Sequence, residues 1–236
     1  MTWRDFFDRD HSIYVNARHK TLHADLVAKG VAAHIPNPQA SVLDYGCGEA
    51  LGARFIAARC AKLFLYDAAP SVRAKLVAAN ATQPNIVVLD DASFDALPAG
   101  SLGVIVVVSV LQYVGEAELS RLLAIFHDKL KDDGVLVLAD IVPKNLSALE
   151  DARALLEFGW RGGFLFAAVA GLARTALSDY RTLRAQYGLS TYDEADMREL
   201  LADHDFDCTR AGENIGHNQQ RMTFVARKAP DDAARD

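Results

Sequence analysis

The stretch SVLDYGCGEA, residues 41–50, constrains the fold more than any other part of the chain. Residues 41–45 form a short apolar run typical of a strand, and residues 50–59 have the pattern of a helix. Between them, Gly46 and Gly48 lack a Cβ, so a ligand can lie against bare backbone at the amino end of that helix. The stretch therefore predicts a nucleotide-binding strand–loop–helix corner.

The details of this corner argue against a dinucleotide site. Such a site has the pattern G-x-G-x-x-G, and here Leu51 occupies the position of the third glycine. Asp44 stands two residues before Gly46, where its charge would repel a pyrophosphate. An acid at this point suits a ligand that carries an ammonium group or has no phosphate.

The sequence VLDYGCGEA resembles the first motif of the class I S-adenosylmethionine-dependent methyltransferases, which runs roughly V-L-D-x-G-C-G-x-G. It matches every fixed position except the last, where Ala50 replaces glycine and predicts a slightly tighter loop. The resemblance implies S-adenosyl-L-methionine as the cofactor, with four residues of the motif at its binding site: Asp44, Gly46, Cys47 and Gly48.

Strand and helix patterns alternate along the rest of the chain, which predicts an α/β fold with a doubly wound, mostly parallel sheet. The resemblance implies seven strands with an antiparallel last strand, the Rossmann-like methyltransferase fold, to which N-terminal helices and a helical insertion are added. We expect an N-terminal helical cap at 1–36, a methyltransferase core at 37–142 and 193–228, an insertion acting as a substrate lid at 143–192, and a disordered tail at 229–236.

Composition limits the partners. A chain of 236 residues that is 51% hydrophobic can bury one large core, and a net charge of −6 argues against a nucleic-acid partner. The three cysteines are scattered, and the first residues lack the apolar core of a signal peptide, so we expect a cytoplasmic protein.

Polar residues follow the next two predicted strands. Asp67 ends the run KLFLYD, about twenty residues after the glycines, where an acid can bind a ribose diol; the alternative is a helix N-cap before Pro70. Ala68 follows it. In the resembling family an acid followed by alanine receives the adenine, which points to Asp91 and Ala92, with a plain loop acid as the alternative.

The apolar run 102–110 predicts a central buried strand. Ser109 lies at the end of this strand and is a candidate for cofactor binding. The following residues, LQYV, resemble the segment that closes over the methionine end in small-molecule methyltransferases, so Gln112 and Tyr113 are candidate substrate-binding residues. No [DNS]-P-P-[YFW] pattern is present, which argues against methylation of nucleic-acid amino groups.

The N-terminal helix carries further candidates. In the resembling family such a helix commonly folds over the cofactor, which makes Tyr14, Arg18 and His19 wall residues. His19 and His23 are four apart and would share a helix face, as a metal-binding pair does. Because no third ligand accompanies them in the sequence, we interpret them as two partly exposed histidines and expect no metal.

The insertion contains an uncharged stretch, GGFLFAAVAGLA at 162–173, too short to span a bilayer. We interpret it as a cap that walls an apolar substrate pocket, with aromatic residues lining or supporting that pocket: Phe158, Trp160, Phe164 and Phe166. A subunit interface, giving a homodimer, and contact with a lipid surface are the alternatives; stable membrane insertion is not expected.

The last two predicted strands, 205–215 and 221–227, are joined by a short connection and therefore form an antiparallel hairpin. If the first of them runs parallel to the rest of the sheet, its polar tip lies on the ligand edge, with Asn214, His217, Asn218 and Gln219. Asn218 is then a substrate-side candidate, and the alternative is an ordinary polar hairpin tip.

These observations favour a methyltransferase that moves a methyl group by in-line displacement to a small, rather apolar molecule, with O-methylation favoured. A base for an oxygen acceptor would come from His217, His19 or Asp140. Two alternatives stay open, a non-catalytic partner protein that binds S-adenosylmethionine and a nicotinamide-dependent oxidoreductase.

Overall fold

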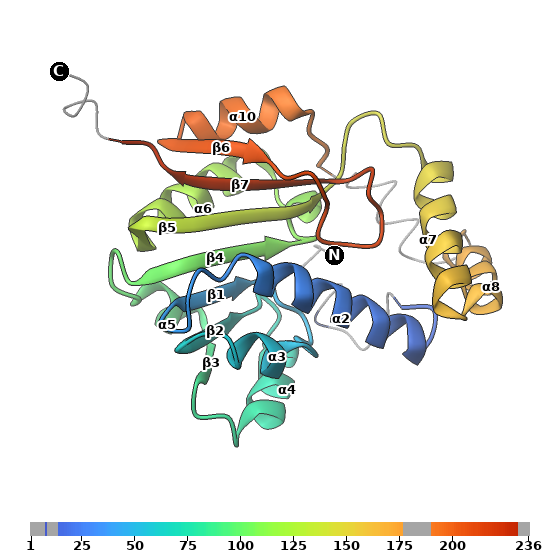
Figure 1. Ribbon diagram of the computed structural model, residues 1–236, viewed down its shortest axis with the longest axis horizontal. Helices are drawn as coiled ribbons and strands as arrows, with labels where there is room; N and C mark the ends of the chain where they lie inside the picture. The colour runs from blue at the N-terminus through green and yellow to red at the C-terminus, as the bar shows by residue number, and fades with distance from the viewer. Residues whose placement is uncertain (1–7, 9–13, 177–189, 231–236) are drawn as a thin grey trace.

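The computed structural model of the chain describes residues 8, 14–176 and 190–230. Within them, seven strands form one sheet in the order β3-β2-β1-β4-β5-β7-β6 (Figure 1). The strands are β1 Ser41–Tyr45, β2 Lys62–Tyr66, β3 Ile86–Leu89, β4 Leu102–Val108, β5 Leu130–Ile141, β6 Phe206–Arg210 and β7 Met222–Lys228.

Strand direction decides where loops meet. The strands β1 to β5 pair in parallel, whereas β7 is antiparallel to both β5 and β6. β6 therefore runs in the same direction as β5, and the β6–β7 loop lies at the edge where the parallel strands end. The predicted doubly wound sheet with an antiparallel last strand is confirmed.

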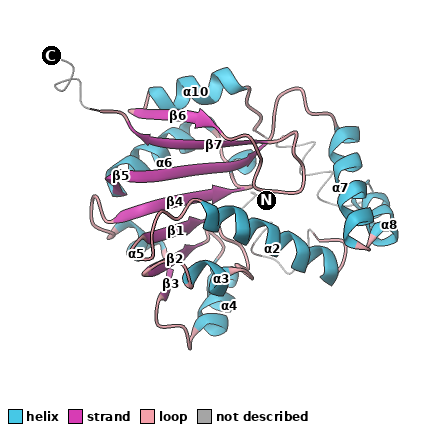
Figure 2. Ribbon diagram, viewed as in Figure 1, coloured by secondary structure: helices cyan, strands magenta, loops and turns pink. Residues whose placement is uncertain are grey.

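Helices cover both faces of this sheet (Figure 2). Those that carry the fold are α2 Ala17–Ala33, α3 Ala53–Ala57, α4 Pro70–Asn80, α5 Asp91–Asp95, the short 3-10 helix η1 Leu111–Tyr113, α6 Glu116–Lys129, α7 Ala148–Gly162, α8 Leu165–Ala176 and α10 Glu194–Ala202.

Two apolar layers result. On one face, buried residues of α5, α6 and α10, such as Phe94, Phe126 and Leu201, pack against the sheet. On the other face the layer comes from α2, α3 and α4, with Val31 and Ile56 among its members. β4 and β5 lie between both layers and are buried on both sides, as their continuous apolar runs require.

Three elements differ from the sequence expectation. The helix expected at 50–59 is only the five residues of α3. β5 begins at Leu130, because the turn expected at 132–134 is an irregularity inside the strand, where the register to β4 shifts between Leu102 and Val104. The strand expected at 205–215 ends at Arg210, so a longer polar loop leads into β7. Of the first thirteen residues of the expected N-terminal helical cap, the structure describes only residue 8.

The insertion forms a helical hairpin, α7 and α8, beyond the carboxyl ends of the strands (Figure 1). α7 starts at a capping box between Ser147 and Glu150 and ends at Gly163, whose φ of 71° is left-handed. Arg18 of α2 donates a hydrogen bond to the Gly162 carbonyl and ties the hairpin to α2. No helix among the described residues is long and apolar enough to cross a membrane.

The seam between α2 and α3 depends on small residues. A Cβ added at Gly52 would lie 2.5 Å from the Ala28 Cβ, and one added at Gly30 would lie 2.8 Å from a methyl group of Ile215. Both distances are shorter than van der Waals contact, so α2 can approach the sheet this closely only because these positions are glycine.

We expect Gly52→Ala to destabilise the protein by about 1–3 kcal/mol, because the added methyl group overpacks the seam. For a chain of this size the midpoint of thermal unfolding should fall by roughly 2–4 °C per kcal/mol. Gly212→Ala is the matched control: a Cβ there meets nothing within 4 Å, and we expect a change of about 0.5 kcal/mol or less. Equal shifts in the two variants would contradict close packing at the seam.

Candidate active site

The corner after β1 has the backbone that its glycines predict. Gly46 and Gly48 have φ values of 72° and 55°, a region that favours glycine. A Cβ on Gly46 would lie 2.4 Å from Val110, whereas one on Gly48 would meet nothing within 4 Å. Gly46 is therefore required by packing, and Gly48 faces open space where a ligand can approach the backbone. Ala50, where the motif has glycine, also has a positive φ of 43° and bears some strain.

Asp67 lies directly against this corner. Its carboxylate accepts hydrogen bonds from the backbone N–H groups of Gly48, at 3.0 Å, and of Ala69, at 2.9 Å. The N-cap of α4 is Ala69 and no side chain caps the helix, so the N-cap alternative for Asp67 is wrong. The bond to Ala69 closes the turn before α4, and the bond to Gly48 fixes the carboxylate beside the glycine loop. A carboxylate at this point can accept hydrogen bonds from the two hydroxyl groups of a diol, which is the role predicted for Asp67.

Asp44 is buried under the same loop, with 8% of its surface exposed. Burial, together with the nearby charge of Asp67, raises its pKa to about 7. A cation placed near these two acids would relieve their repulsion and lower that pKa again. Burial also raises the pKa of the Cys47 thiol well above its usual range, so Cys47 contributes backbone and packing here and no thiolate.

The two aspartates after β3, Asp90 and Asp91, have different hydrogen-bond partners. Asp90 caps α5, because its side chain accepts from the Ser93 N–H at 2.8 Å. Asp91 accepts from the Tyr66 hydroxyl at 2.9 Å and from Arg73 at 3.2 Å, and it remains largely exposed. Asp91 and not Asp90 is therefore oriented toward the ends of β2 and β3. Ala92 follows it in the first turn of α5.

The ends of β4 and β5 are joined by side chains. Ser109 and Asp140 both have left-handed φ values, 59° and 60°, which are uncommon for residues other than glycine. The Ser109 hydroxyl donates to an Asp140 oxygen at 2.6 Å. Gln112 in η1 is buried and donates to the Ser109 carbonyl at 3.2 Å. Strained backbone of this kind persists only where its surroundings hold it, and it is typical of functional sites.

Asp140 belongs to a buried ionic network that sequence reasoning missed. Arg221, at the start of β7, contacts Asp140 at 2.7 Å and Asp151 of α7 at 2.9 Å. Asn214 donates to the other Asp140 oxygen at 3.0 Å. Asn218, only 2% exposed, donates to Asp151 at 2.7 Å. These bonds fasten α7 and the β6–β7 loop to the end of β5.

Three histidines from distant parts of the chain meet beside this network. His19 and His23 lie on one face of α2, and His217 lies in the β6–β7 loop; one ring nitrogen of each lies within 4.8 Å of the other two. The fold thus adds a third histidine, His217, to the helix pair, and His19, which we expected to be partly exposed, is buried.

Aromatic rings enclose this cluster. His19 stacks on Phe164 with centroids 5.1 Å apart, and His217 stacks on Phe158 at 5.2 Å. Tyr14 contacts His19 edge-on at 5.4 Å. The rings pack against His19 and His217, so the cluster lies in a largely apolar setting, which we call the histidine box.

Burial changes the protonation of these histidines. The pKa of His19 falls to about 4, first because burial disfavours the charged ring and then because His23 and His217 lie close. The pKa of His217 also falls to about 4, again chiefly through burial. Burial lowers the pKa of His23 as well. All three imidazoles are therefore neutral at pH 7.

A groove of about 480 Å³ adjoins the box, lined by apolar side chains of the α7–α8 turn, including Trp160, Phe164 and Phe166. Phe164 is 4% exposed and faces the histidines, whereas Trp160 is 74% and Phe166 is 91% exposed at the groove rim. The predicted aromatic lining thus divides into a buried part and an outer part.

Other predicted residues are placed differently. Arg18 is occupied at the end of α7 by its bond to Gly162. Asn218 is buried within the ionic network. Tyr113 lies in η1 next to Gln112, and the Gln112 carbonyl accepts a hydrogen bond from the Ser190 N–H at 2.9 Å.

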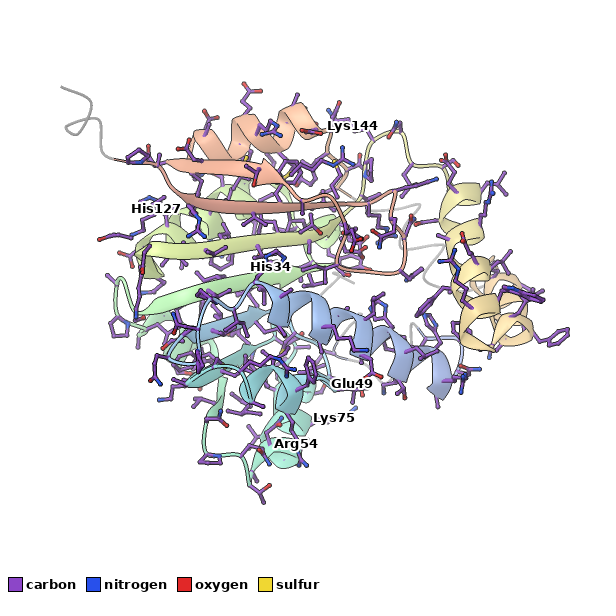
Figure 3. All side chains as sticks on the ribbon, viewed as in Figure 1. His34, Glu49, Arg54, Lys75, His127 and Lys144 are labelled. Atoms are coloured by element: carbon purple, nitrogen blue, oxygen red, sulfur yellow. The ribbon has the colours of Figure 1, made fainter. Side chains whose placement is uncertain are left out.

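The two halves of the site lie along one edge of the sheet. β1, β4 and β5 are neighbours, so the glycine corner and Asp140 are separated by two strand spacings, about 10 Å. Lys20 of α2 forms an ion pair with Glu49 of the corner, which Figure 3 labels close to α2. The same helix therefore borders both the cofactor corner and the histidine box.

The family of this chain is established by comparison. The methyltransferase domain family matches residues 15–211. No curated protein sequence matches.

Solved structures show the same fold at low identity. DhpI in complex with SAH is 12% identical, with a TM-score of 0.61 over 96% of this chain and 95% of that one. Magnesium protoporphyrin IX methyltransferase from Synechocystis PCC 6803 with bound SAM is 18% identical, with a TM-score of 0.56 over 96% and 89%. Phosphoethanolamine N-methyltransferase 1 from Haemonchus contortus is 14% identical, with a TM-score of 0.64 over 98% of this chain and 48% of that one.

The family match covers most of the chain, and the sheet order, the antiparallel last strand and the open glycine corner agree with it. The family match argues against a nicotinamide-dependent oxidoreductase. Two of the solved structures with this fold contain SAH or SAM. The chain belongs to the methyltransferase domain family, and it has the fold of the methyltransferase structures solved with SAH or SAM.

Proposed function

We propose that the protein methylates an oxygen atom of a small, largely apolar acceptor held in the box between α2, the α7–α8 hairpin and the β6–β7 loop. The observation that carries the proposal is the enclosure of three neutral histidines by aromatic rings, at the edge of the sheet that also carries the cofactor corner. Two structural neighbours act, by their names, on small molecules, a magnesium porphyrin and phosphoethanolamine.

In this proposal the cofactor is held by the corner residues. Asp67 accepts the ribose hydroxyls, and Asp91 with the Ala92 N–H receives the adenine. Asp44 lies under the glycine loop, where its carboxylate would attract the methionine ammonium. Burial and then the charge of Asp67 raise the pKa of Asp44, and a bound cation would lower it. Gly46, Cys47, Gly48 and Ala68 supply backbone and space, and Ser109 borders the methionine end.

The acceptor faces the histidine box, with its apolar body against Phe158, Phe164 and Trp160. When bound, S-adenosylmethionine supplies a methyl group on a positively charged sulfur: the acceptor oxygen bonds to that carbon while the carbon–sulfur bond breaks and its electron pair stays on sulfur. The box positions the oxygen and excludes water, which are the main contributions the reaction needs from the protein.

The acceptor proton goes to a histidine in this scheme. His217 and His19 are neutral and can accept it, whereas the Asp140 carboxylate already accepts from Ser109, Asn214 and Arg221. We therefore assign Asp140 a positioning role. With a pKa of about 4 the histidines are weak bases, which favours an acceptor whose hydroxyl is itself acidic, such as a phenol or a carboxylic acid.

We also propose that the protein forms a homodimer through the α7–α8 hairpin, because this hairpin exposes large apolar side chains. Trp160 and Phe166 are 74% and 91% exposed, together with Val169 on α8. A second copy packing on this face would bury them, and sedimentation of the purified chain would detect it.

For cofactor binding we expect Asp67→Asn to weaken S-adenosylmethionine binding roughly tenfold or more, about 1.4 kcal/mol, because charge-assisted hydrogen bonds to the ribose are lost. Isothermal titration calorimetry with the cofactor and with its demethylated product measures this. Asp207→Asn, on the far edge strand β6, removes the same charge and should leave both affinities unchanged. An unchanged affinity in Asp67→Asn would remove Asp67 from the cofactor site.

For the acceptor side we expect His217→Ala to lower kcat by about 10²-fold or more while cofactor affinity stays constant, because proton acceptance and positioning are lost. His127→Ala is the control, since Figure 3 places His127 at the opposite end of the sheet. Paired acceptors that carry either a hydroxyl or an amino group on one aromatic skeleton test the acceptor atom. Methylation of the amines alone would refute the O-methylation proposal.

The low histidine pKa values also predict how stability depends on pH. His217 titrates near 6.5 when unfolded and near 4 when folded, so between these values the unfolded chain binds more protons and stability falls as pH falls. Asp44 acts oppositely, and comparison with a variant cancels its effect. Between pH 7 and pH 5 the wild type should lose more thermal stability than His217→Gln does. Parallel loss in both would show that His217 is protonated normally.

A further inference from the structure

The histidine cluster has the composition of a metal site. We propose that His19, His23 and His217 bind one divalent transition-metal ion of the zinc type, with a fourth coordination position open toward the acceptor groove. The inference deepens the proposed function, since the ion would lie in the acceptor box, but metal binding itself requires neither cofactor nor acceptor.

The ligands come from two rigid supports. His19 and His23 are separated by one turn of α2, and residues four apart on a helix share a face. Their spacing is that of the histidine pair in many zinc sites. Two such ligands need a third from elsewhere, and the β6–β7 loop provides it.

The loop that carries His217 is held firmly. Asn214 accepts from the Asp140 N–H at 3.0 Å, and its own N–H donates to Gln219 at 2.9 Å. Gln219 in turn donates to the Gly216 carbonyl at 2.8 Å. A Cβ on Gly216 would lie 2.8 Å from Asp140, so the loop lies directly against the end of β5. The third ligand is therefore preorganised.

One ring nitrogen in the cluster lacks a partner. Nδ1 of His23 is the single buried side-chain polar atom without a hydrogen bond among the residues that the structure describes. Leaving such an atom unsatisfied costs roughly 1–3 kcal/mol. A metal ion would satisfy it, because a neutral imidazole nitrogen is a metal ligand.

The charges around the cluster favour a cation. Arg221 carries one positive charge, but Asp140 and Asp151 together carry two negative charges, so this network has a net charge of −1. All three groups interact electrostatically with His217.

Binding requires a small contraction. In a tetrahedral site with bonds of about 2.0–2.1 Å the nitrogens lie about 3.3 Å apart, closer than the 4.8 Å limit within which they lie here. Rotation of the side chains would have to bring the nitrogens closer by at most the difference, about 1.5 Å. Nδ1 of His19 accepts a long hydrogen bond of 3.3 Å from the Val15 N–H. This bond can stay if His19 binds the metal through Nε2, and it must break if His19 binds through Nδ1. Three nitrogen ligands favour zinc or cobalt over magnesium, which prefers oxygen.

Such an ion would explain how weakly basic histidines assist transfer to oxygen. A divalent cation with an open position lowers the pKa of an oxygen ligand, which removes the need for a strong protein base. In that case the released proton passes to solvent, and the histidines act as ligands.

The test is a titration of chelator-treated protein with Co²⁺, followed by visible absorption, and with Zn²⁺, followed by calorimetry, both without cofactor. We expect one equivalent of metal with a tetrahedral Co²⁺ spectrum. His23→Ala and His217→Ala should each weaken binding at least tenfold, His217→Cys should restore it because a thiolate is also a ligand, and His127→Ala should change nothing.

Cofactor binding by each variant checks that it is folded. Absence of saturable metal binding, or binding that is unchanged in both His23→Ala and His217→Ala, would overturn the metal site. Those results would leave the methyl-transfer proposal intact, because turnover by the chelator-treated enzyme is measured separately. Conversely, if the protein binds metal but does not methylate hydroxyl acceptors, the O-methylation proposal is refuted and the metal-site proposal stands.

Discussion

The geometry of the acceptor half depends on one buried cation. Arg221 contacts Asp140 at the end of β5 and Asp151 on α7, so a single guanidinium connects the sheet, the insertion and the last hairpin. Removing a partner from a buried ion pair leaves an uncompensated charge and is strongly destabilising. The pair of acids holds the guanidinium charged: burial alone would lower the pKa of Arg221, but Asp140 and Asp151 raise it further than burial lowers it.

The cofactor half could be predicted because its information is local. The glycine corner, the acid after β2 and the choice of Asp91 over Asp90 all follow from neighbouring residues in short segments, and the structure places them at one edge of the sheet. Their contacts with a ligand stay predictions. The main local error was at 132–134, where an Asp-Asp-Gly turn signal proved to be an irregularity inside β5.

The acceptor half could not be predicted in the same way, since its contacts join residues far apart in sequence. His19 and His217 meet because β6 runs in the same direction as β5 and ends at the edge of the sheet where α2 lies. The sequence displayed both parts, a histidine pair at helical spacing and a loop rich in polar side chains, but no pattern links them. Arg221 was missed for the same reason, because an arginine beside a strand has no distinctive local signal.

The position of His217 also bears on the order in which the protein can mature. All the predicted contacts to adenine and ribose lie within the first 92 residues, although β1 pairs with β4 and Gly46 packs on Val110, which follow them in the chain. The histidine box closes only after α2 meets a loop synthesised nearly 200 residues later. Loss of the C-terminal hairpin would therefore remove both His217 and Arg221 from the acceptor half, while every residue predicted to contact adenine or ribose would remain in the chain.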